Sequence, residues 1–282
     1  MKKSPKTIKV RQNKKLIKPR GTSDKDKKIT KGNEFNKDIQ IIAVWGSPSS
    51  GKTILSIQLA KYLAKEKKNV MLIHDDVFCP VLPITFPSLT GNDNEKSLGK
   101  ILSSPTIDQS LILNNAITLK HSDYIAVLGH QKGENPLTYS EYSKETVLDF
   151  LLLTKHLVDY VIIDCTSITT ESILTITALE MADKVIRLST ADFKGLSYLK
   201  SFLPLLIDPK FNTENHLRVI SPVKPFQDSH SVNDIIRGSS IFVPYLEEIG
   251  KQDIEGRLYE ITNNKEYNRV IKQIFEVIHY EQ

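Results

Sequence analysis

Short apolar runs alternate with longer amphipathic segments from about residue 39 to the end of the chain. This alternation is typical of βαβ units, in which a helix returns the chain to the start of the next parallel strand. The apolar runs predict strands at Gln40–Trp45, Asn69–His74, Tyr124–Leu128, Tyr160–Asp164, Lys184–Leu188, Leu217–Ile220 and Ile241–Val243. The amphipathic segments predict helices at Lys52–Lys65, Glu141–Leu157, Glu171–Met181 and Asp192–Leu206.

Several of these strands are nearly continuous runs of β-branched residues, as in Val161-Ile162-Ile163. Strands of this kind are usually covered on both faces. The pattern therefore predicts an α/β fold with a doubly wound, mostly parallel sheet and helices on both faces. Residues 78–123 interrupt the regularity with many Pro, Ser, Thr, Asn and Gly residues, and we expect a long loop there with short helices at Leu98–Leu102 and Asp108–Ile117.

The last stretch of the chain also carries apolar residues at helical spacing, namely Tyr267, Val270, Ile271, Ile274, Phe275 and Ile278. Such a face either packs on a protein core or lies on a membrane surface. The basic residues of this stretch are Lys265, Arg269 and Lys272, and its acidic residues are Glu266, Glu276 and Glu281. Because a membrane-surface helix usually has a basic polar face, the balanced charges favour a helix that packs on the core.

Charge divides the chain into two parts. The net charge is +5, yet residues 1–38 hold 14 Lys and Arg against 4 Asp and Glu, which leaves the remainder acidic. The basic part has few large apolar residues and no sustained periodicity, so we predict a disordered basic arm at 1–38 and one folded α/β domain at 39–282. The arm is either a solubilising extension or an electrostatic contact for nucleic acid, anionic lipid or an acidic partner.

The composition, with 40% hydrophobic and 25% charged residues, is that of a globular protein. No apolar stretch reaches the roughly 20 residues that cross a bilayer, and no apolar segment follows the basic N-terminus as in a signal peptide. We therefore expect a cytoplasmic protein. Two cysteines, Cys79 and Cys165, flank apolar segments and are predicted to be buried free thiols.

One segment fits the phosphate-binding pattern G-x-x-x-x-G-K-[ST], and it consists of Gly46, Ser47, Pro48, Ser49, Ser50, Gly51, Lys52 and Thr53. It follows a predicted apolar strand and opens a predicted helix, which is the context that the mechanism requires. Backbone N–H groups of such a loop and the N-terminus of the helix bind phosphates. We expect ATP and Mg²⁺ as ligands, with Lys52 on the β- and γ-phosphates and the Thr53 hydroxyl on Mg²⁺.

Carboxylates end two of the neighbouring strands. Asp164 ends the run Tyr160–Asp164 and is our candidate for the second metal-binding residue, the Walker-B aspartate; the alternative is a cap for the next helix. The second strand ends in His74-Asp75-Asp76 at the edge where doubly wound sheets bind ligands. One of these carboxylates is a candidate to orient the attacking water, and the alternative is a solvated acidic turn.

The order of these motifs resembles the MinD/ParA family of ATPases, including the later segment Ala182-Asp183-Lys184-Val185-Ile186. Within the family, Leu128–Pro136 and Trp45–Pro48 look most similar to the TadZ/CpaE branch, whose members help to localise pilus or secretion machinery. The resemblance implies an ATP-dependent homodimer that acts as a switch and positions a larger assembly, with recruitment to a membrane or cell pole. It assigns catalytic roles to Lys52, Asp164 and Asp76, the last in the switch I segment. It also places Ser221–Lys224 and Pro225–Gln227 near the adenine.

One position departs from the family pattern. Most members carry a lysine directly after the first glycine of the loop, and this chain has Ser47 there. In the family that lysine reaches the nucleotide of the partner subunit, so its absence implies a weak ATPase, or a protein that keeps ATP as a structural ligand for partner docking. A further alternative is a ParA-like DNA-partition ATPase that uses the basic arm. The loop Pro48–Thr53 also resembles that of RecA-type ATPases, but Ala182–Ile186 favours MinD/ParA.

Overall fold

The computed structural model describes residues 40–85, 91–119, 122–228, 230, 232–233, 240–260 and 262–280. The predicted basic arm at 1–38 lies outside them. The strands are β1 (Ile41–Gly46), β2 (Val70–His74), β3 (Ile117–Leu119), β4 (Ser122–Leu128), β5 (Tyr160–Asp164), β6 (Lys184–Ser189), β7 (Leu217–Val223) and β8 (Ile241–Pro244). The helices are α1 (Lys52–Lys65), α2 (Leu82–Thr85), α3 (Leu98–Leu102), α4 (Gln109–Asn115), α5 (Lys144–Leu157), α6 (Ile173–Met181), α7 (Phe193–Phe202), α9 (Glu247–Ile254) and α10 (Lys265–Tyr280).

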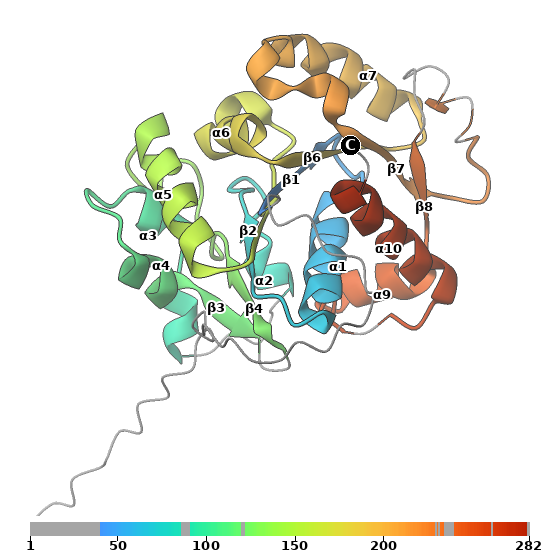
Figure 1. The fold of residues 1–282 in the computed structure, drawn as a ribbon. Helices are drawn as coiled ribbons and strands as arrows, with labels where there is room; N and C mark the ends of the chain where they lie inside the picture. Colours follow the sequence, from blue (N-terminus) through green and yellow to red (C-terminus); the bar gives the residue numbers. More distant parts are fainter. Residues whose placement is uncertain are drawn as a thin grey trace, which may run out of the picture.

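All the described strands belong to one sheet in the order β3-β4-β2-β5-β1-β6-β7-β8 (Figure 1). Every neighbouring pair is parallel except β3 with β4, which is antiparallel. The first strand lies near the middle, and the chain winds outward from it in both directions. The predicted doubly wound α/β fold is confirmed.

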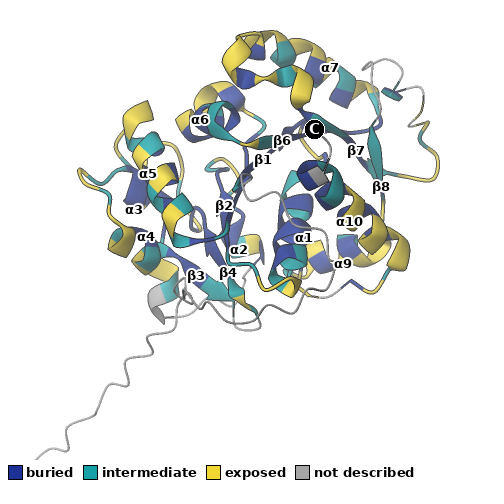
Figure 2. Cartoon of the chain, viewed as in Figure 1, coloured by how far each residue is buried: buried dark blue, intermediate teal, exposed yellow. Residues whose placement is uncertain are grey.

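The two faces of the sheet carry separate cores, because side chains alternate between faces along each strand. On β1, Ile42 and Val44 face α1 and α10, whereas Ile41, Ala43 and Trp45 face α5 and α6. Figure 2 shows the central strands as buried and the outer surfaces of the helices as exposed. Covering on both faces explains why β1, β2 and β5 read as continuous apolar runs.

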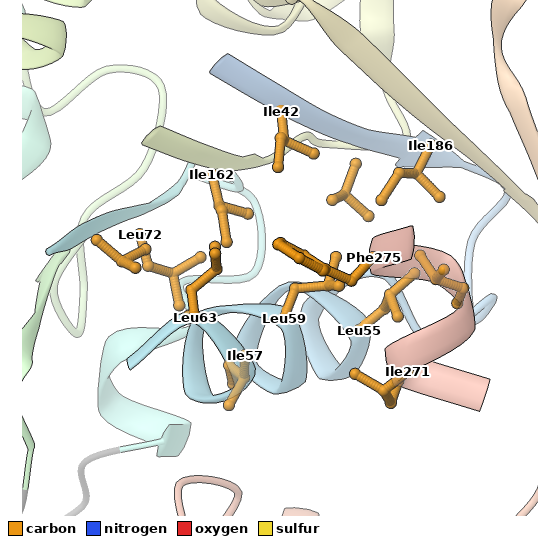
Figure 3. Packing of buried hydrophobic residues seen from close by; sticks show 14 of the residues in the cluster. Ile42, Leu55, Ile57, Leu59, Leu63, Leu72, Ile162, Ile186, Ile271 and Phe275 are labelled. Carbon is orange, nitrogen blue, oxygen red and sulfur yellow. The ribbon is translucent and has the colours of Figure 1, made fainter. Parts of the chain in front are cut away.

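The C-terminal helix packs on the core, as predicted. The six apolar residues named for its face, from Tyr267 to Ile278, are all buried, and they join one cluster with residues of α1 and β1. In Figure 3, Phe275 and Ile271 of α10 lie against Leu55 and Leu59 of α1. The membrane-surface alternative is therefore wrong for this face. No helix in the described part of the chain has the length and apolar character needed to span a membrane.

Three sequence expectations need correction. Ile117 was predicted to end the helix that starts at Asp108, but the helix stops at Asn115 and Ile117 begins the edge strand β3. Helix α9 was not predicted, because its short apolar pattern is weak. Cys79 is exposed, since it lies in the loop after β2, and only Cys165 is buried as predicted.

We predict that Phe275→Ala lowers the free energy of unfolding by about 3–5 kcal/mol, the range for removing a large buried aromatic side chain. Phe275 is 1% exposed and its ring lies 4.9 Å, centroid to centroid, from that of Tyr62 on α1. Urea unfolding followed by circular dichroism measures the change. The matched control is Gln273→Ala on the exposed face of the same helix, which should change stability by less than about 0.5 kcal/mol. Equal effects from the two substitutions would contradict the packing described for α10.

Candidate functional site

The glycine-rich loop joins β1 to α1 at the carboxyl edge of the sheet (Figure 1). Its first residue, Gly46, has a φ of 155°, and a Cβ atom there would lie 2.0 Å from the carbonyl oxygen of Leu188 on β6. Its second glycine, Gly51, has a left-handed φ of 78° and directly precedes α1. A residue with a side chain fits neither position without strain. The two glycines therefore let the backbone turn tightly over the sheet edge.

The serines of the loop hold its shape. Ser47 is 1% exposed; its N–H donates to the carbonyl oxygen of Leu188 (3.1 Å), and its Oγ accepts from the N–H of Thr190 (3.2 Å). Ser50 is also buried and donates from Oγ to the Ser47 carbonyl oxygen (2.7 Å). Pro48 and Ser49 are exposed at the top of the loop.

Lys52, the first residue of α1, turns back over the loop. Its Nζ donates to the carbonyl oxygen of Ser47 (3.1 Å) and to Oγ of Ser167 (2.5 Å), which in turn donates to the carbonyl oxygen of Gly46 (3.0 Å). Burial lowers the pKa of Lys52, while the carboxylates of Asp164 and Asp76 oppose that shift. A partly buried ammonium held over a loop of N–H groups is suited to bind an anion.

Asp164 is the meeting point of three elements. Its Oδ2 accepts from Oγ1 of Thr53 on α1 (2.7 Å) and from Nδ1 of His74 at the end of β2 (2.8 Å). The parallel register of β2 and β5 places His74 directly beside Asp164. The other carboxylate oxygen, Oδ1, is buried and has no hydrogen-bond partner among the residues that the structure describes. Such an oxygen is costly unless a ligand satisfies it.

The two carboxylates that follow His74 differ in their surroundings. Asp75 is buried, and its Oδ2 accepts from the hydroxyls of Ser172 and Thr175 at 2.5 Å each. Asp76 is partly exposed, and its Oδ1 accepts from the N–H groups of Phe78 (3.0 Å) and Cys79 (2.9 Å). Asp76 thus stabilises the turn that follows β2, and it also lies close enough to Lys52 to affect its pKa.

The arrangement brings together most of the residues predicted from the sequence. Lys52, Thr53 and Asp164 meet at the carboxyl edge, with Asp76 beside them. The end of β7 also borders the loop, since a Cβ on Gly51 would lie 3.4 Å from Oγ of Ser221.

Sequence reasoning missed two partners in this site. The first is Ser167, which accepts from Lys52, and the second is His74, which donates to Asp164. The signal for His74 was present, because its strand and that of Asp164 were predicted to end at the same edge. For Ser167 there was no signal, since it lies in the irregular segment after β5.

A magnesium ion fits the donors at this edge. A hydroxyl oxygen, a carboxylate and water or phosphate oxygens are the ligands that Mg²⁺ prefers. Thr53 and Asp164 supply the first two, and the unpartnered Oδ1 of Asp164 is the buried atom that such an ion would satisfy.

Comparisons with known proteins support the fold. The family model described as "Chromatin associated protein KTI12" matches residues 40–127, which is less than half of the chain. No curated protein sequence matches. A plasmid partition protein from Borrelia burgdorferi B31 bound to AMPPNP is 17% identical with a TM-score of 0.65, covering 85% of this chain and 98% of that one.

Two further solved structures carry the MinD name. MinD from Pyrococcus horikoshii OT3, complexed with Mg-ADP, is 12% identical with a TM-score of 0.60 over 84% of this chain and 96% of that one. MinD in a MinC:MinD complex from Aquifex aeolicus is 14% identical with a TM-score of 0.63 over 84% and 94%. The sheet order and the glycine-rich loop define a P-loop NTPase fold. Within that class, the chain has the fold of the MinD and ParA ATPases.

We predict that ionisation of the buried Asp75 side chain lowers the stability of the folded protein as the pH rises. Burial is the main cause that raises the pKa of Asp75 to about 6, although the hydroxyls of Ser172 and Thr175 oppose it. Because the folded pKa exceeds the unfolded one, protonated Asp75 contributes stability that is complete below about pH 4 and lost as the pH rises through 6. Asn is neutral throughout and still accepts hydrogen bonds, so Asp75→Asn should be more stable than the parent by about 3 kcal/mol at pH 7.5.

Urea unfolding of parent and variant at pH 4 and pH 7.5 measures this difference. At pH 4 the two chains should differ little, because Asp75 is then mostly protonated in the folded state. A stability difference that does not change with pH would contradict the prediction.

Proposed function

We propose that this chain is a magnesium-dependent ATP-binding switch of the MinD/ParA type, which dimerises with ATP and positions a larger assembly. The proposal rests on one observation. The Lys52 ammonium lies over the glycine-rich loop, and at the same edge the Thr53 hydroxyl donates to the Asp164 carboxylate. The likeness to a partition protein bound to AMPPNP and to a MinD complexed with Mg-ADP supports the same ligand class.

Each residue has a role that follows from its position. The N–H groups of the loop and the ammonium of Lys52 would hold the phosphates, while Thr53 and Asp164 would hold Mg²⁺. When bound, the ion neutralises charge that develops on the phosphate oxygens. Asp76, at the neighbouring strand end, would orient the attacking water. His74 fixes the orientation of the Asp164 carboxylate, since both groups share one short hydrogen bond.

Exposed apolar side chains occur in several segments that follow the strands of the sheet, and they support a homodimer. More than half of the large exposed apolar side chains among the described residues lie in segments that follow strand ends, namely Phe78, Leu137, Ile168, Ile173, Phe193, Phe226 and Tyr245. Apolar groups gathered on one side of a protein are typical of an interaction surface. A two-fold dimer that meets through this edge would cover them and enclose the nucleotides.

Ser47 supports slow turnover. Its hydroxyl is uncharged, buried and bonded to the backbone N–H of Thr190. It therefore cannot supply the positive charge that the family's lysine places on a partner subunit's nucleotide. Without that charge, we propose a weak ATPase. The second candidate function, a partner-docking protein that keeps ATP as a structural ligand, rests on the same observation, and a turnover assay separates the two.

The identity of the assembly that the switch positions is a more specific proposal. The sequence resemblance of Leu128–Pro136 to the TadZ/CpaE branch supports pilus or secretion components as partners of a cytoplasmic protein recruited to the membrane or cell pole. The basic arm at 1–38 is proposed to add non-specific contact with DNA or anionic membranes. A pull-down of the native chain tests both: recovery of DNA alone would favour a partition role.

We predict that Lys52→Ala reduces ATP binding by at least a hundredfold, because the ammonium is the charged donor above the loop and Gly46–Thr53 holds no other lysine. Isothermal titration calorimetry with ATP and Mg²⁺ measures the affinity, and circular dichroism checks that the fold persists. Lys155→Ala on α5 is the control and should bind as the parent does. If the Lys52 variant bound ATP within a few-fold of the parent, the proposed site would be wrong.

We predict that Asp164→Asn and Asp76→Asn separate two duties of the site. Asp164→Asn should weaken ATP binding only when Mg²⁺ is present, because it removes the charge that holds the ion. Asp76→Asn keeps an oxygen for the N–H groups of Phe78 and Cys79, so it should retain ATP binding and ATP-dependent dimers while losing hydrolysis.

Calorimetry with and without Mg²⁺, phosphate release, and light scattering after size exclusion provide these measurements. Normal hydrolysis by the Asp76 variant would remove Asp76 from the mechanism. If Mg²⁺ raised the ATP affinity of the Asp164 variant as much as it raises that of the parent, Asp164 would not be a metal ligand.

A further inference from the structure

A basic groove runs between α1 and α10, away from the glycine-rich loop. Its volume is about 360 Å³, and its walls come from the second half of α1, the first half of α10 and the segment just before α10. Its basic lining residues are Lys61, Lys65, Lys265, Arg269 and Lys272, and no acidic residue in the described part of the chain lines it. Figure 1 shows the two helices side by side, and the rings of Tyr62 and Phe275 fix their contact at 4.9 Å.

The cations face one another from regular positions on the two helices. Lys61 and Lys65 are one turn apart on α1, and Lys265, Arg269 and Lys272 follow the i, i+4, i+7 spacing on α10. Like charges at this spacing repel each other. Burial, and to a smaller extent the charge of Lys65, lower the pKa of Lys61 to about 8, although Glu248 and Glu260 oppose the shift.

Some of this charge is already compensated. Lys61 donates to the carbonyl oxygens of Leu258 and Glu260, and Lys272 forms an ion pair with Glu276 at 3.4 Å. Lys65, Lys265 and Arg269 have no ion pair within the described residues. The groove therefore holds cationic groups that an anion would stabilise.

The groove also contains buried polar atoms without partners. Nε2 of Gln58 and Oγ1 of Thr262 make no hydrogen bond, although these residues are only 5% and 3% exposed. Both residues line the groove. A buried donor without an acceptor costs free energy that a bound acceptor recovers. Both atoms lie beneath the surface of the groove, so a ligand in the groove would accept hydrogen bonds from them once the side chains of Gln58 and Thr262 turn toward it.

We propose that the groove binds a small anion with at least two phosphoryl groups, at a site separate from the glycine-rich loop. Phosphoryl oxygens accept from Arg and Lys and from a neutral amide such as that of Gln58. The volume lies at the lower end of the range for small-molecule sites. Duplex nucleic acid fits the observations less well, because its phosphates would contact the exposed lysines and leave Gln58 Nε2 unsatisfied.

Isothermal titration calorimetry with pyrophosphate tests the proposal in the full-length Lys52→Ala chain, where the glycine-rich loop lacks its ammonium. Adding Lys265→Ala and Arg269→Ala should weaken pyrophosphate binding about tenfold or more, the factor expected for lost charge-assisted hydrogen bonds. The matched control adds Lys155→Ala and Lys200→Ala on α5 and α7, which removes the same charge elsewhere. That control should change the affinity less than about threefold.

A second variant tests the buried donor without changing the charge. Gln58→Met should weaken pyrophosphate binding while the melting temperature stays equal or rises, because the unpartnered amide is removed from the fold. Equal pyrophosphate affinity in the groove variant and the charge control would overturn the proposal. It would also be overturned if the groove variant lost binding to duplex DNA or phosphatidylserine vesicles while its pyrophosphate affinity was unchanged.

Discussion

The carboxylate of Asp164 is the interaction on which the geometry of the sheet edge depends. One of its oxygens accepts from both Thr53 and His74, so the helix after the loop, the second strand and the fifth strand are held at one point. The bond from His74 is buried and the bond from Thr53 is partly buried, and charge-assisted hydrogen bonds are stronger away from bulk water. A shift of α1 or of β2 against β5 would remove one of the two hydrogen bonds that this oxygen accepts. The Asp164 side chain thus helps to fix the position of the loop relative to the sheet.

The same edge is secured from the side by backbone contacts that only small residues allow. Gly46 brings β1 so close to β6 that a side chain would overlap the Leu188 carbonyl. The hydroxyl of Ser47 accepts a hydrogen bond from the N–H of Thr190. The residue that departs from the family pattern therefore has a structural task in this chain. Its hydroxyl links the loop to the segment that leads into α7, a connection that a long cationic side chain at this position would not make.

Local patterns determined what the sequence could predict. The boundaries of α1 and β5 were predicted to the residue, because a continuous apolar run and a helical period are visible within one segment. The three-residue strand β3 was missed, since it is defined only by its pairing with β4. The contact of His74 with Asp164 was missed for a related reason, because it depends on the register of strands separated by 90 positions in the chain.

The chain's single tryptophan occupies an informative place in this structure. Trp45 immediately precedes the loop, is 0% exposed, donates from Nε1 to Oγ1 of Thr169 (2.8 Å), and lies 5.8 Å from the ring of Tyr198. Its indole therefore touches the segments after β5 and β6 as well as the end of β1. Fluorescence excited at the indole band arises from this one position, so the protein carries an intrinsic optical reporter directly beneath its glycine-rich loop.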